Sequence, residues 1–176
     1  MTRDKQLRRR IRALLAFFVL GLVVSGLTAF ALETELRLLG ALVDIDPSAA
    51  PETYNGLQYW IAWVARGIRD TNARYPFIAY GTDWLAFGHL VIAVTFIGPL
   101  RDPVRNVWVV TAGMIACAGV IPLALIAGEV RGIPLYWRLI DCSFGVVGII
   151  PLWLSRRCIA ELQAMGLRND PARPAG

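Results

Sequence analysis

The chain has 176 residues, of which 56% are hydrophobic, and its formal net charge is +5. Soluble globular proteins hold about 45–50% apolar residues, whereas here the excess falls in a few long blocks, which is typical of membrane proteins. The basic residues flank those blocks, so they indicate membrane topology and argue against a nucleic-acid partner.

The apolar blocks predict four transmembrane helices, because a bilayer core of about 30 Å needs roughly 20 apolar residues in a helix. In chain order the blocks are residues 13–32, 76–100, 107–128 and 136–155. The alternative for the first block is a cleaved signal peptide, but the block exceeds the roughly 7–15 apolar residues of a signal peptide. The sequence therefore predicts an all-α, polytopic membrane protein with the lipid bilayer as its surroundings.

The distribution of charge predicts the orientation of these helices. Twelve of the basic residues fall in the N-terminal tail, in the loop between the second and third blocks, and in the tail 156–176. Basic residues collect on the cytoplasmic side of bacterial inner-membrane proteins. We therefore expect a multi-pass protein of the bacterial inner membrane with both termini in the cytoplasm.

Residues 33–75 are the longest segment between blocks, and part of this segment has helical periodicity. Between residues 52 and 70, apolar side chains recur at the spacing of one helical face: Tyr54, Leu57, Trp60, Ile61, Val64 and Ile68. This pattern predicts an amphipathic helix on the periplasmic side, lying on the outer leaflet or over the bundle. The helix is either a strut or a partner-docking surface, and in the second case Trp60, Trp63 and Ile68 face the partner.

Small residues recur along the blocks at helical spacing. The pairs and triplets are Gly21 and Ser25; Ala112, Ala116 and Gly119; and Ser143, Gly145 and Gly148. Small side chains let helix backbones approach closely in a membrane. The pattern predicts a compact four-helix bundle that forms a single membrane domain over residues 1–176.

Three cysteines, Cys117, Cys142 and Cys158, lie in or beside the apolar blocks. None has a CxxC neighbour, so neither a zinc site nor a disulfide framework is predicted, and we assign no metal ligands. The chain also contains no P-loop, GxSxG or HExxH motif. Catalytic residues are therefore unknown, and the sequence argues against an enzyme more than for one.

Four ionisable residues lie within the outer halves of the second and fourth blocks: Asp83, His89, Arg138 and Asp141. Ionisable groups inside a membrane are costly and often mark a functional site. If the two blocks are neighbours, these residues form one polar cluster below the periplasmic surface.

Three interpretations of this cluster are open. It can be an ion-paired structural knot in which Arg138 pairs with Asp141 three residues away. It can be a ligand or proton site open to the periplasm, since histidine titrates near neutral pH and arginine binds carboxylates. It can also place His89 as the single axial ligand of a porphyrin or chlorophyll-type pigment, which is the one cofactor that the sequence suggests.

Several segments around this cluster resemble known proteins. They are YGTDWLAFGH at residues 80–89, GPLRDPVRN at 98–106, GIP at 132–134 and WRLIDCSFG at 137–145. These segments resemble a family of small bacterial four-helix membrane proteins that has no assigned activity, and the resemblance covers roughly residues 75–160. It implies a membrane fold and no particular chemistry.

Two functions follow as hypotheses. The first is an accessory or assembly subunit of a larger membrane complex, with other membrane subunits as partners. The second is a self-contained protein that binds or transports a small molecule, an anion or a proton through the Asp/His/Arg cluster.

Overall fold

The computed structural model describes residues 2–168. Within that stretch every regular element is a helix and no strand is formed, which confirms the all-α prediction. The chain divides into two compact units. We call Leu22–Ile92 the inner unit and the described residues before and after it the outer unit, and these two names refer only to the order of the sequence.

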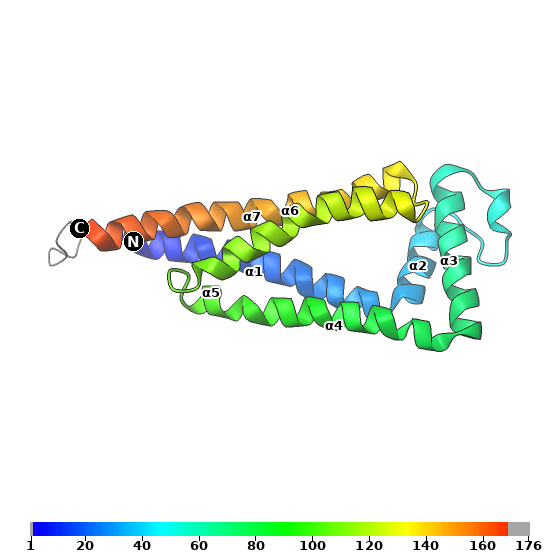
Figure 1. Ribbon diagram of the computed structural model, residues 1–176, viewed down its shortest axis with the longest axis horizontal. Helices are drawn as coiled ribbons and strands as arrows, with labels where there is room; N and C mark the ends of the chain where they lie inside the picture. The colour runs from blue at the N-terminus through cyan, green and yellow to red at the C-terminus, as the bar shows by residue number, and fades with distance from the viewer. Residues whose placement is uncertain (1, 169–176) are drawn as a thin grey trace. The chain divides into compact units, whose positions relative to one another are not determined.

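Four helical segments are long and apolar enough to cross a membrane, as the sequence predicts (Figure 1). They are α1 (Arg3–Phe30), the segment Pro76–Arg101, α6 (Val107–Val130) and most of α7 (Leu135–Arg168). At 1.5 Å per residue, the 28 residues of α1 extend over about 42 Å, which exceeds a bilayer core of about 30 Å. The basic first turns of α1 are thus a helical continuation of its apolar part.

The second apolar segment is built from three helices. The short 3-10 helix η2 (Pro76–Ile78) leads into α4 (Tyr80–Thr95), and α5 (Ile97–Arg101) follows after a break at Phe96. Pro99 lies in the first turn of α5, where a missing N–H is tolerated because the first N–H groups of a helix have no partner within it.

A separate helix, α2 (Leu32–Leu42), follows α1. It is not a continuation of α1, because the backbone leaves the helical region at Ala31, with φ −109° and ψ 35°. The chain then turns at Asp44, whose φ of 56° lies in the left-handed region that aspartate adopts more readily than most residues.

The helix expected over 52–70 corresponds to two elements, η1 (Pro51–Thr53) and α3 (Gly56–Arg74). They are separated because Tyr54 and Asn55 are extended, with ψ values of 167° and 157°. The φ of Gly56 is 55°, which glycine adopts without a steric penalty, so glycine suits the first position of α3.

The core of the outer unit lies among α1, α5, α6 and α7. Its fully buried side chains include Ile11, Leu15, Phe96, Val110, Leu152 and Ile159. The rings of Phe18 and Phe96 meet at 4.9 Å, and the Arg12 guanidinium donates a hydrogen bond of 3.2 Å to the Leu100 carbonyl. An ion pair between Arg3 and Glu161 joins the first turn of α1 to α7.

Glycines let α6 and α7 pack closely. A Cβ atom added at Gly145 would lie 2.5 Å from the carbonyl oxygen of Cys117, and one added at Gly148 would lie 2.9 Å from the Cys117 sulfur. A Cβ at Gly113 would lie 2.8 Å from the ring of Phe96. Gly145 and Gly148, two of the predicted small residues, therefore lie at a close helix contact, where small residues are common in membrane proteins.

In the inner unit, α1 and α4 meet at another glycine. A Cβ at Gly26 would lie 3.0 Å from the Ala86 carbonyl oxygen and 3.1 Å from the Cβ of His89. The predicted pair Gly21 and Ser25 is exposed instead, and a Cβ at Gly21 would meet nothing within 4 Å. The close approach is displaced by one residue, or about 100° around α1, from the predicted face.

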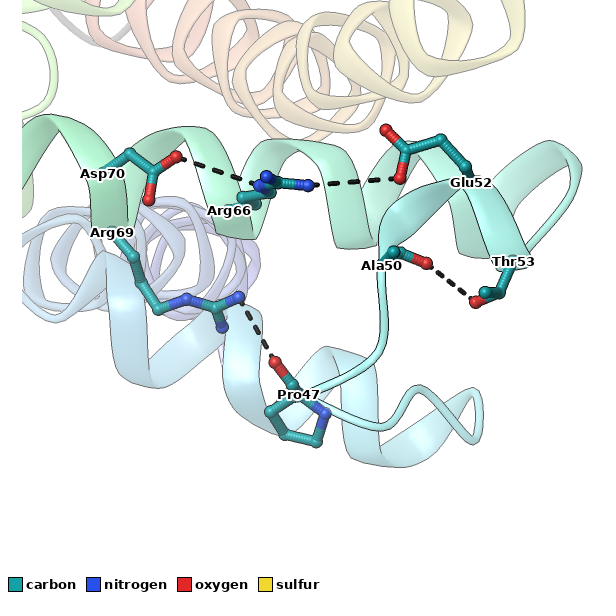
Figure 2. A network of polar contacts seen from close by, with 7 residues as sticks. All are labelled: Pro47, Ala50, Glu52, Thr53, Arg66, Arg69 and Asp70. Carbon is teal, nitrogen blue, oxygen red and sulfur yellow. Dashed lines mark hydrogen bonds and ion pairs between the residues drawn. The ribbon is translucent and has the colours of Figure 1, made fainter.

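Polar contacts hold the segment between α2 and α3 against α3 (Figure 2). Arg66 lies 4.0 Å from Glu52 and 3.9 Å from Asp70, and Arg69 donates a hydrogen bond of 3.5 Å to the Pro47 carbonyl. The hydrogen bonds within η1 and its flanks include one of 2.7 Å from the Thr53 hydroxyl to the Ala50 carbonyl. These contacts engage Arg66 and Arg69, two of the basic side chains of α3.

Candidate functional site

The inner unit contains a groove of about 770 Å³ between three stretches of chain. One stretch is the junction of α1 and α2, the second is α3, and the third is η2 with the first turn of α4. The groove is lined by Ala29 to Thr34, by Trp60, Trp63, Val64, Gly67, Ile68, Thr71 and Asn72, and by Ile78, Ala79, Thr82 and Asp83. Its volume falls in the range of about 300–1,000 Å³ that small-molecule sites occupy.

The charged residues that line this groove are both acidic. They are Glu33 in the first turn of α2 and Asp83 in the first turn of α4. Carboxylates are favourable at these positions because the N-terminus of a helix carries partial positive charge. Asn72 donates a hydrogen bond to Glu33, and within residues 2–168 neither carboxylate forms an ion pair.

Aromatic and aliphatic side chains of α3 form one wall. Trp60, Trp63 and Ile68, which the sequence assigns to a partner-facing surface, all line the groove. Trp63 is 48% exposed and stacks on Tyr59 with ring centroids 6.1 Å apart. On the other side of α3, Ile61 and Ala62 are buried. The three residues thus lie on the side of α3 that faces the groove, which Asp83 also lines.

A smaller cavity of about 250 Å³ lies between α2, the residues that follow it, and α3. It shares Glu33 with the groove, but its other charged lining residues are Arg37 and Arg69. Arg69 also donates a hydrogen bond to the Pro47 carbonyl, and neither Arg37 nor Arg69 lines the groove.

His89 lies two turns further along α4 and does not line the groove. Its Nδ1–H donates a hydrogen bond of 2.8 Å to the Leu85 carbonyl four residues earlier. With Nδ1–H as the donor, the lone pair of the neutral ring lies on Nε2, which is the nitrogen that axial ligation of a porphyrin or pigment would use. Its Cβ packs against Gly26, so His89 also contributes to the contact between α1 and α4.

Arg138 ties α7 to α6 in the outer unit. Its Nη1 forms an ion pair with Glu129 and donates a hydrogen bond of 3.2 Å to the Leu125 carbonyl. Its stem crosses Gly128, where an added Cβ would lie 2.5 Å from the Arg138 Cδ. The side chain of Arg138 is only 14% exposed, so this arginine is held in place by α6.

Asp141, the partner expected for Arg138, is half-buried, and in the described part of the chain it forms no ion pair. The expected Arg138–Asp141 pair is replaced by Arg138–Glu129. Glu129 is close because Gly132, with a φ of 68°, turns the chain sharply between α6 and α7. Asp83 and His89 belong to the inner unit, whereas Arg138 and Asp141 belong to the outer unit.

The groove includes residues that the sequence reasoning missed, above all Glu33, Gly67 and Asn72. Glu33 could have been noticed, because it is the first charged residue after the first apolar block. Gly67 and Asn72 carry no signal of their own. Among residues 2–168, no group of three His, Cys, Asp or Glu side chains is arranged to hold a metal ion.

Comparisons with known proteins add no relative from which a function could be inferred. No protein-family model, no curated protein and no solved structure matches the chain. The resemblance to small bacterial four-helix membrane proteins therefore stays a prediction from the quoted motifs, and so does the ligand-binding role of Asp83, His89, Arg138 and Asp141.

Proposed function

We propose that the chain is an accessory or assembly subunit of a larger complex in the bacterial inner membrane. In this arrangement both termini are cytoplasmic, and α2 and α3 are periplasmic, with α3 along the membrane surface. The four long apolar helices support membrane insertion, and the excess of basic residues near the two termini supports the orientation.

One observation carries the subunit role, namely that α6 has two faces of small residues and packs only one of them. Gly113 and Cys117 lie against other parts of the outer unit. One residue away, or about 100° around the helix, Ala112, Ala116 and Gly119 are exposed. The sequence predicts that these three residues pack within the bundle, but a Cβ at Gly119 would meet nothing within 4 Å.

A transmembrane helix of another polypeptide is the occupant that this face fits. Lipid tails fill a surface of any shape, so a lipid-facing helix gains nothing from small side chains. A second helix does gain, since small residues at i and i+4 let the two backbones approach closely. Of the large exposed side chains, Ile115 lies beside the face and Leu123 continues it four residues after Gly119, so both would contact the partner helix.

Native mass spectrometry on the protein extracted gently from its own membranes tests this role. We expect the mass of a second polypeptide at fixed stoichiometry. Ala116→Leu, which fills the small-residue face, should remove that mass. The matched control is Ala118→Leu, the same change at an exposed alanine of α6 that lies two residues further on and therefore on another side of the helix, and it should leave the complex intact.

Two results would overturn the subunit role. The first is a lone chain from gentle extraction, and the second is a partner mass that Ala116→Leu does not affect. A mass equal to a second copy of this chain would show that the α6 face is used for self-assembly, and the heteromeric role would then be rejected.

The orientation is tested separately by cysteine labelling in intact cells. A cysteine placed at Thr53 should react with a membrane-impermeant maleimide added to the periplasm. A cysteine placed at Arg105, between α5 and α6, should react only after the inner membrane is opened. Reaction of both positions, or of Arg105 alone, in intact inner membranes would contradict the proposed topology.

A binding function is the second candidate, and it is favoured by the position of Asp83 in the groove. The geometry supports this function in the inner unit alone, since Arg138 is engaged by Glu129. The chemical class of the ligand is argued in the following subsection.

A further inference from the structure

The groove in the inner unit lies where two apolar helices end. It is bounded by the last residues of α1 and the first turn of α4. Exposed aromatic side chains continue along the same end of α4: Phe77, Tyr80 and Trp84 are 72%, 61% and 58% exposed. Aromatic side chains of this kind collect at the level of the lipid headgroups, so the groove opens at that level once α4 is in a membrane.

The charge of the groove selects a cation. Glu33 and Asp83 are its two charged lining residues, and within the described chain neither is paired with a basic side chain. Two arginines of α3 are engaged away from the groove: Arg66 contacts Glu52 and Asp70, and Arg69 donates a hydrogen bond to the Pro47 carbonyl, as Figure 2 shows. Two carboxylates at a low-dielectric boundary attract a positive group more strongly than they would in bulk water.

The walls of the groove favour an organic cation over an inorganic one. Trp60 and Trp63 line the same groove as the two carboxylates, and tryptophan is the best aromatic partner for an ammonium group. An inorganic ion would require several oxygen ligands at short distance, whereas an ammonium needs only a few acceptors and an apolar surface for its carbon atoms.

We propose that this groove binds the primary ammonium headgroup of a phospholipid, with Glu33 and Asp83 accepting its hydrogen bonds and Trp60 and Trp63 covering its carbon atoms. The inference rests on the proposed membrane insertion and is independent of the proposed partner on α6. A lipid is the occupant because the groove opens where lipid headgroups are concentrated, at the ends of two apolar helices. A choline headgroup fits less well, because it has no N–H to donate.

Gly67 offers a way to fill the groove without disturbing the fold. It lines the groove from α3, and an added Cβ would meet nothing within 4 Å. Gly67→Leu therefore places a side chain in the open space, and it raises the helix propensity of α3 at the same time. This variant should fold at least as well as the wild type and lose the ligand.

The test is lipid binding by the purified full-length chain, followed by native mass spectrometry. The delipidated protein is given an equimolar mixture of phosphatidylethanolamine, phosphatidylcholine and phosphatidylglycerol with identical acyl chains. We expect phosphatidylethanolamine to be retained preferentially. Asp83→Asn removes one charged acceptor and should weaken retention about tenfold, and Gly67→Leu should abolish the preference.

The matched control is Asp70→Asn, which neutralises an exposed carboxylate of α3 that lies outside the groove, and it should bind lipid like the wild type. Equal retention of the three lipids, or unchanged retention by both groove variants, overturns the proposal. If free ethanolamine displaces the lipid at equal concentration, the ammonium site stands and its assignment to a lipid is overturned. A gel-filtration profile equal to that of the wild type confirms that each variant is folded.

Discussion

Gly145→Ala is expected to destabilise the contact between α6 and α7. The added methyl would lie 2.5 Å from the carbonyl oxygen of Cys117, whereas ordinary van der Waals contact begins at 3.4 Å. The atom it meets belongs to the backbone of α6 and cannot rotate away, so the two helices must separate locally by about 1 Å. Overpacking of this kind costs roughly 1–3 kcal/mol.

Gly119→Ala is the matched control for this substitution. It makes the same change on α6, where the added methyl would meet nothing within 4 Å. Replacing glycine by alanine inside a helix stabilises it by up to about 1 kcal/mol, and this gain applies to both variants. The difference between the two variants therefore isolates the steric clash, and it should be roughly 1–3 kcal/mol.

The assay is reversible unfolding of the purified chain in mixed micelles of a mild detergent and sodium dodecyl sulfate, followed by circular dichroism. Gly145→Ala should unfold at a lower fraction of sodium dodecyl sulfate than the wild type, and Gly119→Ala at an equal or higher one. If the two variants agree within about 0.5 kcal/mol, the close approach of the helices is not a source of stability, and the reasoning from glycine packing fails.

Three further outcomes are expected. The pKa of Asp46 is lowered by hydrogen bonds from the Ser48 hydroxyl and backbone N–H, so the charged carboxylate stabilises the folded chain. This stabilisation is complete above the ordinary pKa of 3.8, and it is lost as the pH falls through the lower pKa of the folded state. In an NMR titration the Ser48 amide should respond with a midpoint below 3.8, and a midpoint at or above 3.8 would contradict this. Gly26→Leu should lower the melting temperature by separating α1 from α4, whereas Gly21→Leu should not, because Gly21 faces open space. Gly128→Ala should displace the stem of Arg138, which crosses Gly128. It should therefore lower the melting temperature more than Glu129→Gln, which removes only the exposed ion-pair partner of Arg138, and an equal loss would contradict this.

The four apolar helices could be predicted from the sequence because length and composition determine whether a segment can span a bilayer. The faces by which they pack could be predicted only in part. In α6 the sequence pointed to Ala112, Ala116 and Gly119, whereas the structure packs Gly113 and Cys117. A helix that is apolar on all sides has no polar face to mark its exposed side. The periodicity therefore shows which small residues share a face, but it does not show which face packs within the protein.

The candidate site shows the same limit for polar residues. The spacing of Arg138 and Asp141 permits a pair within one helix, but the turn at Gly132 brings Glu129 to the arginine instead. Asp83 and Trp60 were identified separately, because a residue inside a membrane block and a helical face are each visible in the sequence. That they line one groove together depends on the directions in which the chain leaves Ala31 and Tyr75, because the sequence indicates where these helices end but not how the next ones are oriented.

The discontinuous outer unit has a consequence for how the protein is made. Its first segment ends at Gly21, and the rest begins at Ala93, so the contacts of Phe18 with Phe96 and Gly148 join residues synthesised far apart in time. During translation the first half of α1 is made well before these partners, whereas the inner unit can assemble from contiguous chain. A ribosome stalled before residue 93 should therefore leave Ile11 and Leu15 without the later segments of the outer unit, in whose core both are fully buried.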